Sequence, residues 1–162
     1  MTEILLADAG ATERLGAGLA GILKDRPGSW LIALAGPLGA GKTTFARGFL
    51  RALGHDGRVP SPTYTLIEPY ELDDRPVLHL DLYRLSDPEE LEYLGFRDVF
   101  QGGALVLVEW PERAGDRLPD ADIGISLSLA GEGRRAVFSA LTPRGADVVD
   151  ALAAGLPVPD LN

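Results

Sequence analysis

The sequence predicts an α/β fold with a mainly parallel central sheet, antiparallel additions and helices on both faces. Two all-apolar runs, at 30–35 and 104–108, are typical of strands buried on both faces, and the first leads through a glycine-rich turn into a helical pattern. Late in the chain, an alternating strand at 123–129 runs into a hairpin turn. Early strand–helix alternation favours parallel pairing, whereas the hairpin adds antiparallel strands.

Helical spacing predicts one helix before the first apolar run and one helix after it. Apolar residues at i, i+4, i+7 and i+8 predict a helix over 12–23 that begins near Thr12. After the run at 30–35 and its turn, a second helical pattern covers 46–53. Gly54 follows that pattern and is suited to the left-handed conformation that often ends a helix.

The middle of the chain contains a loop, two strand-like runs and a helix. Proline, serine and threonine at 58–65 predict a loop. Strand-like runs at 64–72 and 77–81 are joined by a predicted turn at 73–76. The Ser-Asp-Pro-Glu sequence that opens 86–95 is a capping-box pattern, which predicts a helix ending near the glycine of that segment.

The last third predicts three strands and a helix. The apolar run at 104–109 ends in a carboxylate, and the alternation at 123–129 is typical of a half-exposed strand. A glycine-rich turn at 131–133 leads into a strand over 136–141, and 144–154 is predicted to be helical. We therefore expect one domain over 1–162, a length close to that of an ordinary single domain.

Composition excludes several function classes. The chain has no cysteine, which excludes disulfides, zinc–thiolate sites, iron–sulfur clusters and a cysteine nucleophile. Fifteen basic and 24 acidic residues give a net charge of −9, so long-range attraction to a polyanion is not expected. No apolar run approaches the ~18 residues of a membrane span, and the acidic start MTEILLADAG does not resemble a signal peptide. We therefore expect a cytoplasmic protein that makes no membrane contact.

Residues 36–43 match the phosphate-binding pattern G-x-x-x-x-G-K-[ST] at every fixed position, between a predicted strand and a predicted helix. Glycines let backbone N–H groups approach phosphate oxygens, and the helix that follows presents its positive dipole end. Lys42 is suited to the β- and γ-phosphates and the Thr43 hydroxyl to Mg²⁺. The alternative is a structural turn with a surface lysine. The residues expected at the nucleotide are Gly36, Leu38, Gly39, Ala40, Gly41, Lys42, Thr43 and Thr44.

Two carboxylates directly follow predicted core strands. Glu109 ends a clean apolar run, and Asp81 ends a run interrupted by His79. Ligands bind outside the carboxyl ends of parallel strands, so both acids are candidates for metal binding or water activation. For Asp81 the alternative is a turn residue or a partner for Arg84. The spacing leaves open which acid contacts Mg²⁺, and His79 is interpreted as a packed strand residue rather than a general base.

Hydroxyl groups gather in the loop between the predicted elements. Ser61, Thr63 and Thr65 could form a segment that senses the γ-phosphate or metal, and the alternative is a proline-stiffened turn. Trp110 follows Glu109 and is either a rim contact for a partner or part of the core. Guanine-specific N-K-x-D cannot occur, because the chain's one asparagine is Asn162, so adenine is favoured by exclusion.

Four segments of the sequence resemble the TsaE (YjeE) family, in family order and at similar spacing. They are residues 36–47 (GPLGAGKTTFAR), 61–66 (SPTYTL), 79–85 (HLDLYRL) and 109–112 (EWPE). The resemblance implies a P-loop NTPase-like fold and a bacterial ATPase required for the threonylcarbamoyladenosine modification of tRNA. It also implies action with the TsaD–TsaB heterodimer, while TsaC makes the threonylcarbamoyl-adenylate donor. ATP hydrolysis would reset the complex between rounds, and contact with tRNA would be indirect.

The resemblance also implies roles for individual residues. Lys42 would hold phosphates, Thr43 and Glu109 would bind Mg²⁺, and Asp81 would assist with metal or water, so that Lys42, Asp81 and Glu109 form the catalytic set. Residues 61–65 would be switch-like. The family further implies Trp110 beside the acid, Thr12 near the nucleotide base and, as a weaker transfer, Arg134. Residues 143–162 match no family motif.

Two other functions are consistent with the phosphate-binding loop. A small-molecule kinase would need an arginine-bearing lid, for which 111–120 offers Arg113 and Arg117. A nucleotide-dependent binding module would use ATP only to order the 61–65 segment. Direct RNA binding is disfavoured by the acidic balance and by the lack of a basic–aromatic platform.

Overall fold

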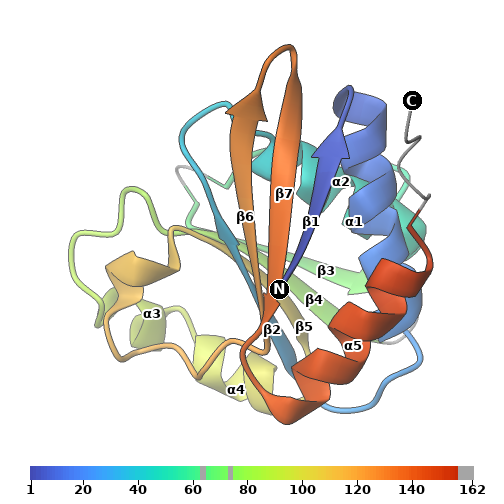
Figure 1. Ribbon diagram of the computed structural model, residues 1–162. Coiled ribbons are helices and arrows are strands. Elements are labelled where there is room, and N and C mark those ends of the chain that lie inside the picture. Colours follow the sequence, from blue (N-terminus) through green and yellow to red (C-terminus); the bar gives the residue numbers. More distant parts are fainter. Residues whose placement is uncertain (63–64, 73–74, 157–162) are drawn as a thin grey trace, which may run out of the picture.

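The computed structural model describes residues 1–62, 65–72 and 75–156. In these residues seven strands form one sheet in the order β1-β7-β6-β2-β5-β4-β3, with helices on both sides (Figure 1). In chain order the elements are β1 (Thr2–Leu6), α1 (Ala9–Leu23), β2 (Trp30–Ala35), α2 (Lys42–Ala52), β3 (Ile67–Leu72), β4 (Arg75–Asp81), α3 (Glu90–Tyr93), α4 (Phe96–Gln101), β5 (Leu105–Glu109), the 3₁₀ helix η1 (Pro111–Ala114), β6 (Ile123–Ala130), β7 (Gly133–Ala140) and α5 (Pro143–Ala154).

The centre of the sheet is parallel and its flanks are antiparallel. Strand β2 pairs in parallel with β5 and β6, and β4 pairs in parallel with β5. The β1–β7, β6–β7 and β3–β4 pairs are antiparallel. The predicted fold class, a central parallel sheet with antiparallel additions, is confirmed. The register sets Glu109 of β5 opposite both Leu34 of β2 and Asp81 of β4, at the carboxyl ends of three strands.

Two hydrophobic clusters cover the two faces of the sheet, as alternation along β5 shows. Leu105 and Leu107 belong to the cluster that includes side chains of α1, α2 and α5. Val106 and Val108 belong to the cluster that includes side chains of α3, α4 and η1. Figure 1 shows these two groups of helices on opposite sides of the sheet, which confirms the predicted layering. Because side chains alternate, Glu109 lies on the face that α2 covers.

Helices α1 and α2 approach each other so closely that glycine is needed in both. A Cβ atom built on Gly48 would lie 2.0 Å from the Glu13 carbonyl oxygen, and one on Gly16 would lie 2.2 Å from the Phe45 carbonyl oxygen. Real Cβ atoms do not approach backbone atoms at such distances, so the two backbones contact each other directly. This contact fixes α2, whose first residue is Lys42, against the N-terminal helix.

The predicted helices differ from the structure at their ends. Helix α1 begins at Ala9, before the predicted start at Thr12, because Asp8 caps it by accepting a 2.8 Å hydrogen bond from Ala11 N. The predicted helix over 86–95 is reduced to the four residues of α3. The residues of the expected capping box bond locally instead: the Ser86 hydroxyl donates to Glu90 Oε1 at 2.6 Å, and Asp87 Oδ1 accepts from Glu89 N at 3.0 Å. Helix α4 was not predicted.

The predicted strands differ in similar ways. Strand β2 matches its prediction, and the β6–β7 hairpin is confirmed. Strand β3 begins at Ile67 rather than at 64, after Leu66 with φ of 66°. Arg75 and Pro76, predicted to lie in the turn, belong to β4 because they pair with Leu72 and Glu71. Residues 73–74 of that turn and Tyr64 lie outside the described residues, and β1 was not predicted.

The C-terminal helix starts one residue before its predicted range. Thr142 caps α5, because its hydroxyl accepts a 3.1 Å hydrogen bond from Gly145 N. None of the helices in the described ranges is long and apolar enough to cross a lipid bilayer.

Candidate functional site

The glycine-rich segment joins the end of β2 to the start of α2, as its sequence predicts. Gly41 caps α2 with φ of 108°, a conformation that favours glycine. A Cβ atom on Gly36 would lie 2.4 Å from the carbonyl oxygen of Leu127 in β6, so the loop also needs glycine where it leaves the sheet. The open N–H groups of the first turn of α2 face the loop. The segment therefore has the backbone geometry of a phosphate-binding loop.

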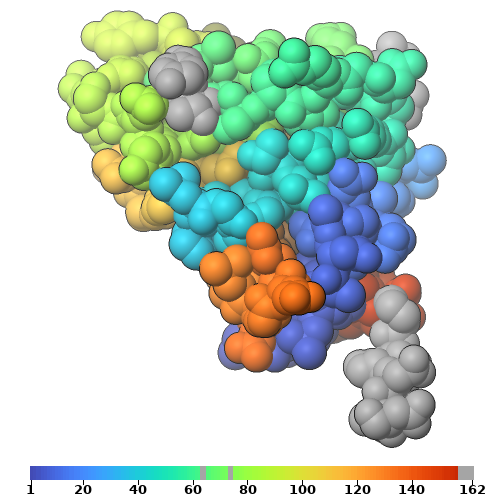
Figure 2. All heavy atoms as spheres, turned by 90° about the horizontal axis from the view of Figure 1, so that it is seen from above, coloured from blue at the N-terminus to red at the C-terminus, as the bar shows by residue number. Residues whose placement is uncertain are grey.

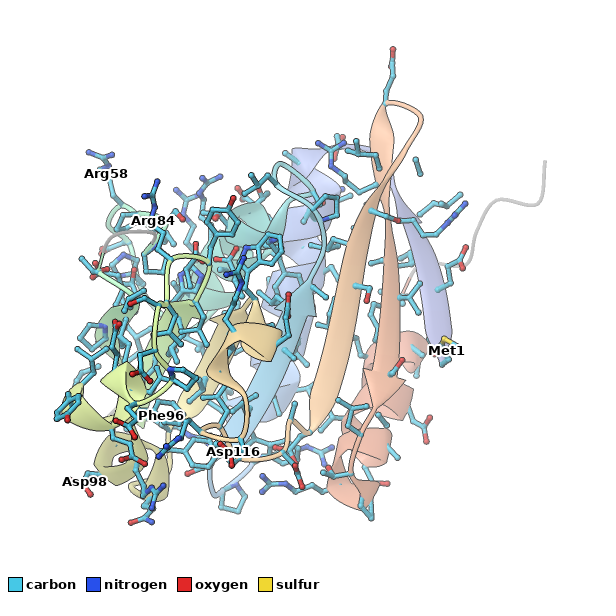
Figure 3. The ribbon with its side chains drawn as sticks, turned by 90° about the vertical axis from the view of Figure 1, so that its left-hand side faces the viewer. Met1, Arg58, Arg84, Phe96, Asp98 and Asp116 are labelled. Atoms are coloured by element: carbon cyan, nitrogen blue, oxygen red, sulfur yellow. The ribbon has the colours of Figure 1, made fainter. Side chains whose placement is uncertain are left out.

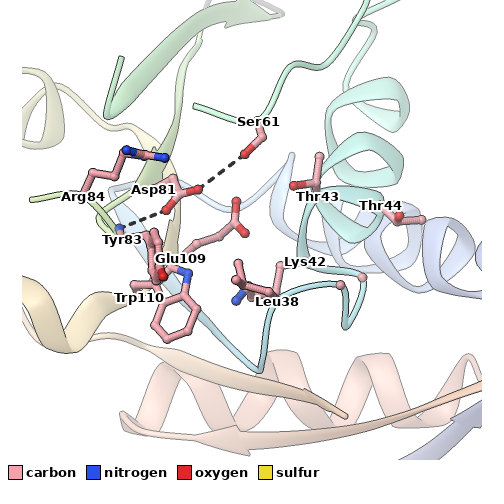
Figure 4. A pocket seen from close by; sticks show the side chains of 12 residues that line it. Leu38, Lys42, Thr43, Thr44, Ser61, Asp81, Tyr83, Arg84, Glu109 and Trp110 are labelled. Atoms are coloured by element: carbon pink, nitrogen blue, oxygen red, sulfur yellow. Dashed lines mark hydrogen bonds between the residues drawn. The ribbon is translucent and has the colours of Figure 1, made fainter. Parts of the chain in front are cut away.

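A cavity of about 380 Å³ lies in front of this loop (Figure 4). It is lined by predicted site residues from the loop, from the 58–65 segment and from the ends of β4 and β5. The lining residues are Leu38, Gly39, Gly41, Lys42, Thr43, Thr44, Ser61, Asp81, Tyr83, Arg84, Glu109 and Trp110.

Some predicted residues do not line this cavity. The Gly36 carbonyl accepts a hydrogen bond from Lys42 Nζ, and Ala40 is buried with its N–H donated to the Pro37 carbonyl at 3.2 Å. Thr65 is exposed, and its hydroxyl donates to Glu68 Oε1 at 3.0 Å. Thr63 lies outside the described residues. Of the three predicted switch-like residues, Ser61 is the one that the structure places at the cavity.

Lys42 is buried at the floor of the cavity, with 5% of its surface exposed. Its ammonium lies 4.1 Å from the centroid of the Trp110 ring. Burial lowers the pKa of Lys42, while the negative charges of Glu109, Asp81 and Glu112 raise it in part. The ammonium is therefore held in a partly desolvated place, where an added anion would interact with it strongly.

The two predicted carboxylates are side by side and nearly buried, with 5% of Asp81 and 3% of Glu109 exposed. Asp81 accepts hydrogen bonds from Tyr83 N at 3.0 Å and from Ser61 Oγ at 3.4 Å, which Figure 4 shows as dashed lines. Glu109 Oε2 lies 2.8 Å from His79 Nε2. The sequence placed His79 in a packed strand, and it is fully buried there, but its contact with Glu109 was not predicted.

The donor set at the cavity fits Mg²⁺ bound together with a phosphate. Mg²⁺ prefers hard oxygen ligands and is usually held by one or two carboxylates, waters and substrate phosphates rather than by a closed protein cage. The Thr43 hydroxyl and the carboxylates of Asp81 and Glu109 supply such oxygens. Among the residues described by the structure, no group of three or more histidine, aspartate and glutamate side chains is arranged to hold a metal by itself.

A second, smaller cavity of about 150 Å³ lies on the other side of the loop. It shares Gly39, Gly41 and Thr44 with the first cavity, and it contains the predicted Thr12 and Arg134. Thr12 is buried, and Arg134 Nη2 donates to the Gly39 carbonyl at 3.1 Å. Figure 2 shows the cyan loop surface beside the orange tip of the β6–β7 hairpin and the dark blue start of α1. Both cavities therefore border the same glycine-rich loop.

Sequence reasoning missed two residues of the first cavity, Tyr83 and Arg84. The Tyr83 ring lies 5.1 Å from that of Trp110, and Arg84 lines the cavity. In Figure 3, Arg84 projects from the end of the molecule opposite Phe96 of α4. Both follow Asp81 at the carboxyl end of β4, and this position is the signal that could have identified them.

The lid residues of the kinase alternative do not line this cavity. Arg117 instead contacts Glu92 at 2.8 Å and Glu89 at 3.4 Å. Arg113 lies 5.7 Å from the centroid of the Tyr83 ring.

A parallel-centred α/β sheet, with a glycine-rich loop between a central strand and a helix, defines the class of proteins built like P-loop NTPases. The family described as "Threonylcarbamoyl adenosine biosynthesis protein TsaE" matches residues 6–137. The chain belongs to the TsaE family, which acts in tRNA threonylcarbamoyladenosine biosynthesis.

Relatives from distant bacteria support this assignment. Each of three is named a tRNA threonylcarbamoyladenosine biosynthesis protein TsaE. The one from Haemophilus influenzae is 45% identical over 121 residues, covering 75% of this chain and 77% of the relative. The Bacillus subtilis protein is 40% identical with 74% of each chain covered, and the Nostoc protein is 38% identical with 94% and 93% covered. The crystal structure of Bacillus subtilis YdiB is similar with a TM-score of 0.79, at 28% identity and 94% coverage of both chains.

Proposed function

We propose that the chain is a Mg²⁺-dependent ATPase that assists the TsaD–TsaB complex in forming N6-threonylcarbamoyladenosine at position 37 of tRNA. One observation carries this proposal: Lys42, Thr43, Asp81 and Glu109, which come from three separate parts of the sequence, line a single cavity at the glycine-rich loop. A cation, a hydroxyl and two carboxylates around a loop of this geometry are the groups that phosphoryl transfer to water requires.

Each residue has a part that follows from its position. The backbone N–H groups at the start of α2 and the Lys42 ammonium would bind the β- and γ-phosphates. Thr43 and Glu109 would hold Mg²⁺, which supplies charge neutralisation to the phosphates when it is bound. Asp81, oriented by Ser61 and the Tyr83 N–H, would position the attacking water or a metal-bound one. The bond between the γ-phosphorus and its bridging oxygen would break as water adds, so that ADP leaves and the protons of the water stay on the inorganic phosphate that forms.

The second cavity supports a place for the nucleotide base. Thr12, Thr44 and Arg134 line it next to the loop, on the side away from the two carboxylates. A nucleotide whose phosphates occupy the first cavity would direct its base toward this second one. The sequence lacks the guanine-reading N-K-x-D motif, so we propose adenine as the base.

We propose that turnover is slow in the isolated chain and rises with its partners. The 61–65 segment would respond to hydrolysis, and the resulting change would reset the TsaD–TsaB complex after each round. TsaC would supply the threonylcarbamoyl-adenylate in the same cytoplasmic pathway. The net charge of −9 agrees with indirect rather than direct contact with tRNA.

Phosphate release from Mg²⁺-ATP tests the proposal directly. The purified chain would be assayed alone and with a TsaD–TsaB pair, with Lys42→Ala as the inactive control. We expect slow release alone, faster release with the pair, and none from the variant under either condition. Release that is indifferent to the pair would contradict the partner-driven ATPase and would call for a screen of small-molecule acceptors.

The same assay separates the two alternatives. A binding module would bind ATP tightly and assemble with the pair without releasing phosphate. A kinase would yield a phosphorylated product. Arg117 contacts Glu89 and Glu92 and does not line the cavity, whereas Arg113 lies near Tyr83, which does, so the search for a phosphorylated product is the test of this alternative.

A further inference from the structure

His79 lies inside the sheet, and its ring contacts the candidate metal ligand Glu109. Its ring is fully buried in β4, two residues before Asp81 and on the same face of the sheet. The β4–β5 register sets His79 opposite Leu107, so the ring reaches diagonally to Glu109, where Nε2 and Oε2 are 2.8 Å apart. The pair connects the core of the sheet to the acid at the cavity.

The direction of this hydrogen bond follows from the chemistry of the two groups. A carboxylate that binds a metal is ionised and can only accept, so in that state His79 would carry a proton on Nε2 and donate it to Glu109. The other ring nitrogen, Nδ1, is buried and has no hydrogen-bond partner among the described residues. Burying a polar nitrogen without a partner costs about 1–3 kcal/mol. An apolar residue would avoid that cost, so the contact with Glu109 is the feature that distinguishes histidine here.

A hydrogen bond to one oxygen of a carboxylate fixes the direction in which the other oxygen points. With Oε2 engaged by His79, Glu109 Oε1 is the oxygen left for the cavity that Lys42 and Thr43 also line. Figure 4 shows the Glu109 carboxylate between Asp81 and Thr43, beside the two other oxygen donors of the cavity. Carboxylates that bind metals are commonly oriented in this way by a second hydrogen bond, and its loss weakens metal affinity about 10- to 100-fold.

We propose that His79 is a positioning residue, which holds Glu109 through its Nε2–H so that one carboxylate oxygen faces the Mg²⁺–nucleotide complex. This inference rests on the proposed function, since it assumes that the nucleotide binds with Mg²⁺ at this acid. It goes beyond that function by assigning the orientation of Glu109 to a residue that touches neither nucleotide nor metal.

The test compares three variants whose side chains differ in where they place a donor. The amide nitrogen of His79→Gln lies as many bonds from Cβ as Nε2 does and can keep the hydrogen bond. The shorter side chain of His79→Asn places its nitrogen at the position of Nδ1 and cannot reach Glu109. His79→Leu keeps the bulk of the side chain but has no donor. For each, binding of a fluorescent ATP analogue would be titrated in EDTA and then across Mg²⁺ concentrations, with unfolding curves measured in parallel.

The expected result is specific to the metal. In EDTA, the affinity for the ATP analogue should stay within about threefold of wild type for all three variants. The Mg²⁺ concentration that gives half of the increase in this affinity should rise about 10- to 100-fold in His79→Asn and His79→Leu, but not in His79→Gln. Equal losses in all three variants, or an unchanged Mg²⁺ requirement in Leu, would overturn the proposal and leave His79 a packing residue.

Failure of the proposed function would look different. Wild type would then bind the analogue with no response to Mg²⁺ at all, which would remove the basis of this inference as well. A normal wild-type response with the three variants indistinguishable from one another would overturn the role of His79 alone.

Discussion

The ammonium of Lys42 lies 4.1 Å from the centre of the Trp110 ring, and it also donates to the Gly36 carbonyl. Trp110 holds this place with φ of 58° and ψ of 50°, a left-handed conformation that is costly for a bulky residue. The lysine of the phosphate-binding loop is thus paired with an aromatic face and a carbonyl, both weaker partners for a cation than the phosphates of a nucleotide.

This arrangement predicts that nucleotide binding changes the fluorescence of Trp110. Phosphates should draw the Lys42 ammonium from the ring, altering the polarity around the indole. Wild type titrated with Mg²⁺-ATP should show a saturable change in emission. The chain has two tryptophans, so Trp110→Phe, which keeps Trp30, is the matched control and should show no change. A change that persists in the control would assign the signal to Trp30 and contradict the movement of Lys42.

The lowered pKa of Lys42 predicts proton uptake on nucleotide binding at alkaline pH. Burial lowers this pKa below the ordinary lysine value of 10.5, and bound phosphates would raise it again. Between the free and the bound pKa, binding takes up a proton, so affinity falls as pH rises through that window, by up to about tenfold per unit. Below the pKa of the free protein, the ammonium is already charged and this dependence disappears.

Calorimetry in two buffers with different ionisation enthalpies measures that uptake. Lys42→Arg is the control, because a guanidinium stays charged throughout the range. Proton uptake that is the same in the variant would show that another group is responsible.

Arg84 is predicted to act on hydrolysis more than on binding. It lines the cavity beyond Asp81, where a positive charge could stabilise the transferring phosphoryl group. Arginines in this role contribute about 10³-fold or more in rate, so Arg84→Ala should lower partner-stimulated phosphate release at least about tenfold. ADP affinity should change little. Arg58 projects from the same end of the molecule in Figure 3, and Arg58→Ala is the charge-matched control. An equal loss in both variants would indicate a general effect of charge.

The parts of the site that were predictable from sequence are those fixed by local pattern. The glycine-rich loop is one continuous segment, so its pattern alone predicts both the turn and the helix at Lys42. Glu109 follows from the abrupt end of a continuous apolar run, because the ends of such buried strands meet at one edge of a parallel sheet. The β6–β7 hairpin was predictable as well, because the alternation of its strands and the glycines of its turn are local signals.

Contacts between distant strands were not predictable in this way. The bond between His79 and Glu109 joins residues 30 positions apart and depends on the register of β4 against β5. Arg134 reaches Gly39 across 95 positions, and its part was suggested by family resemblance alone. Strand β1 was missed because it pairs only with β7, from the other end of the chain, and tertiary pairing rather than a local signal makes it a strand.

The close contact of α1 with α2 predicts opposite effects for two glycine substitutions. In Gly48→Ala the new methyl group would lie 2.0 Å from the Glu13 carbonyl, which would force apart the helices that position Lys42. Overpacking of this kind costs about 1–3 kcal/mol, so the free energy of unfolding should fall by that amount. Gly21→Ala is the matched control, since Gly21 is exposed on α1 with no atom within 4 Å of its Cβ position. Alanine there should stabilise the helix by about 0.5–1 kcal/mol. Urea unfolding of both variants checks the prediction, and a Gly48→Ala protein as stable as wild type would show that the two helices can separate at no cost.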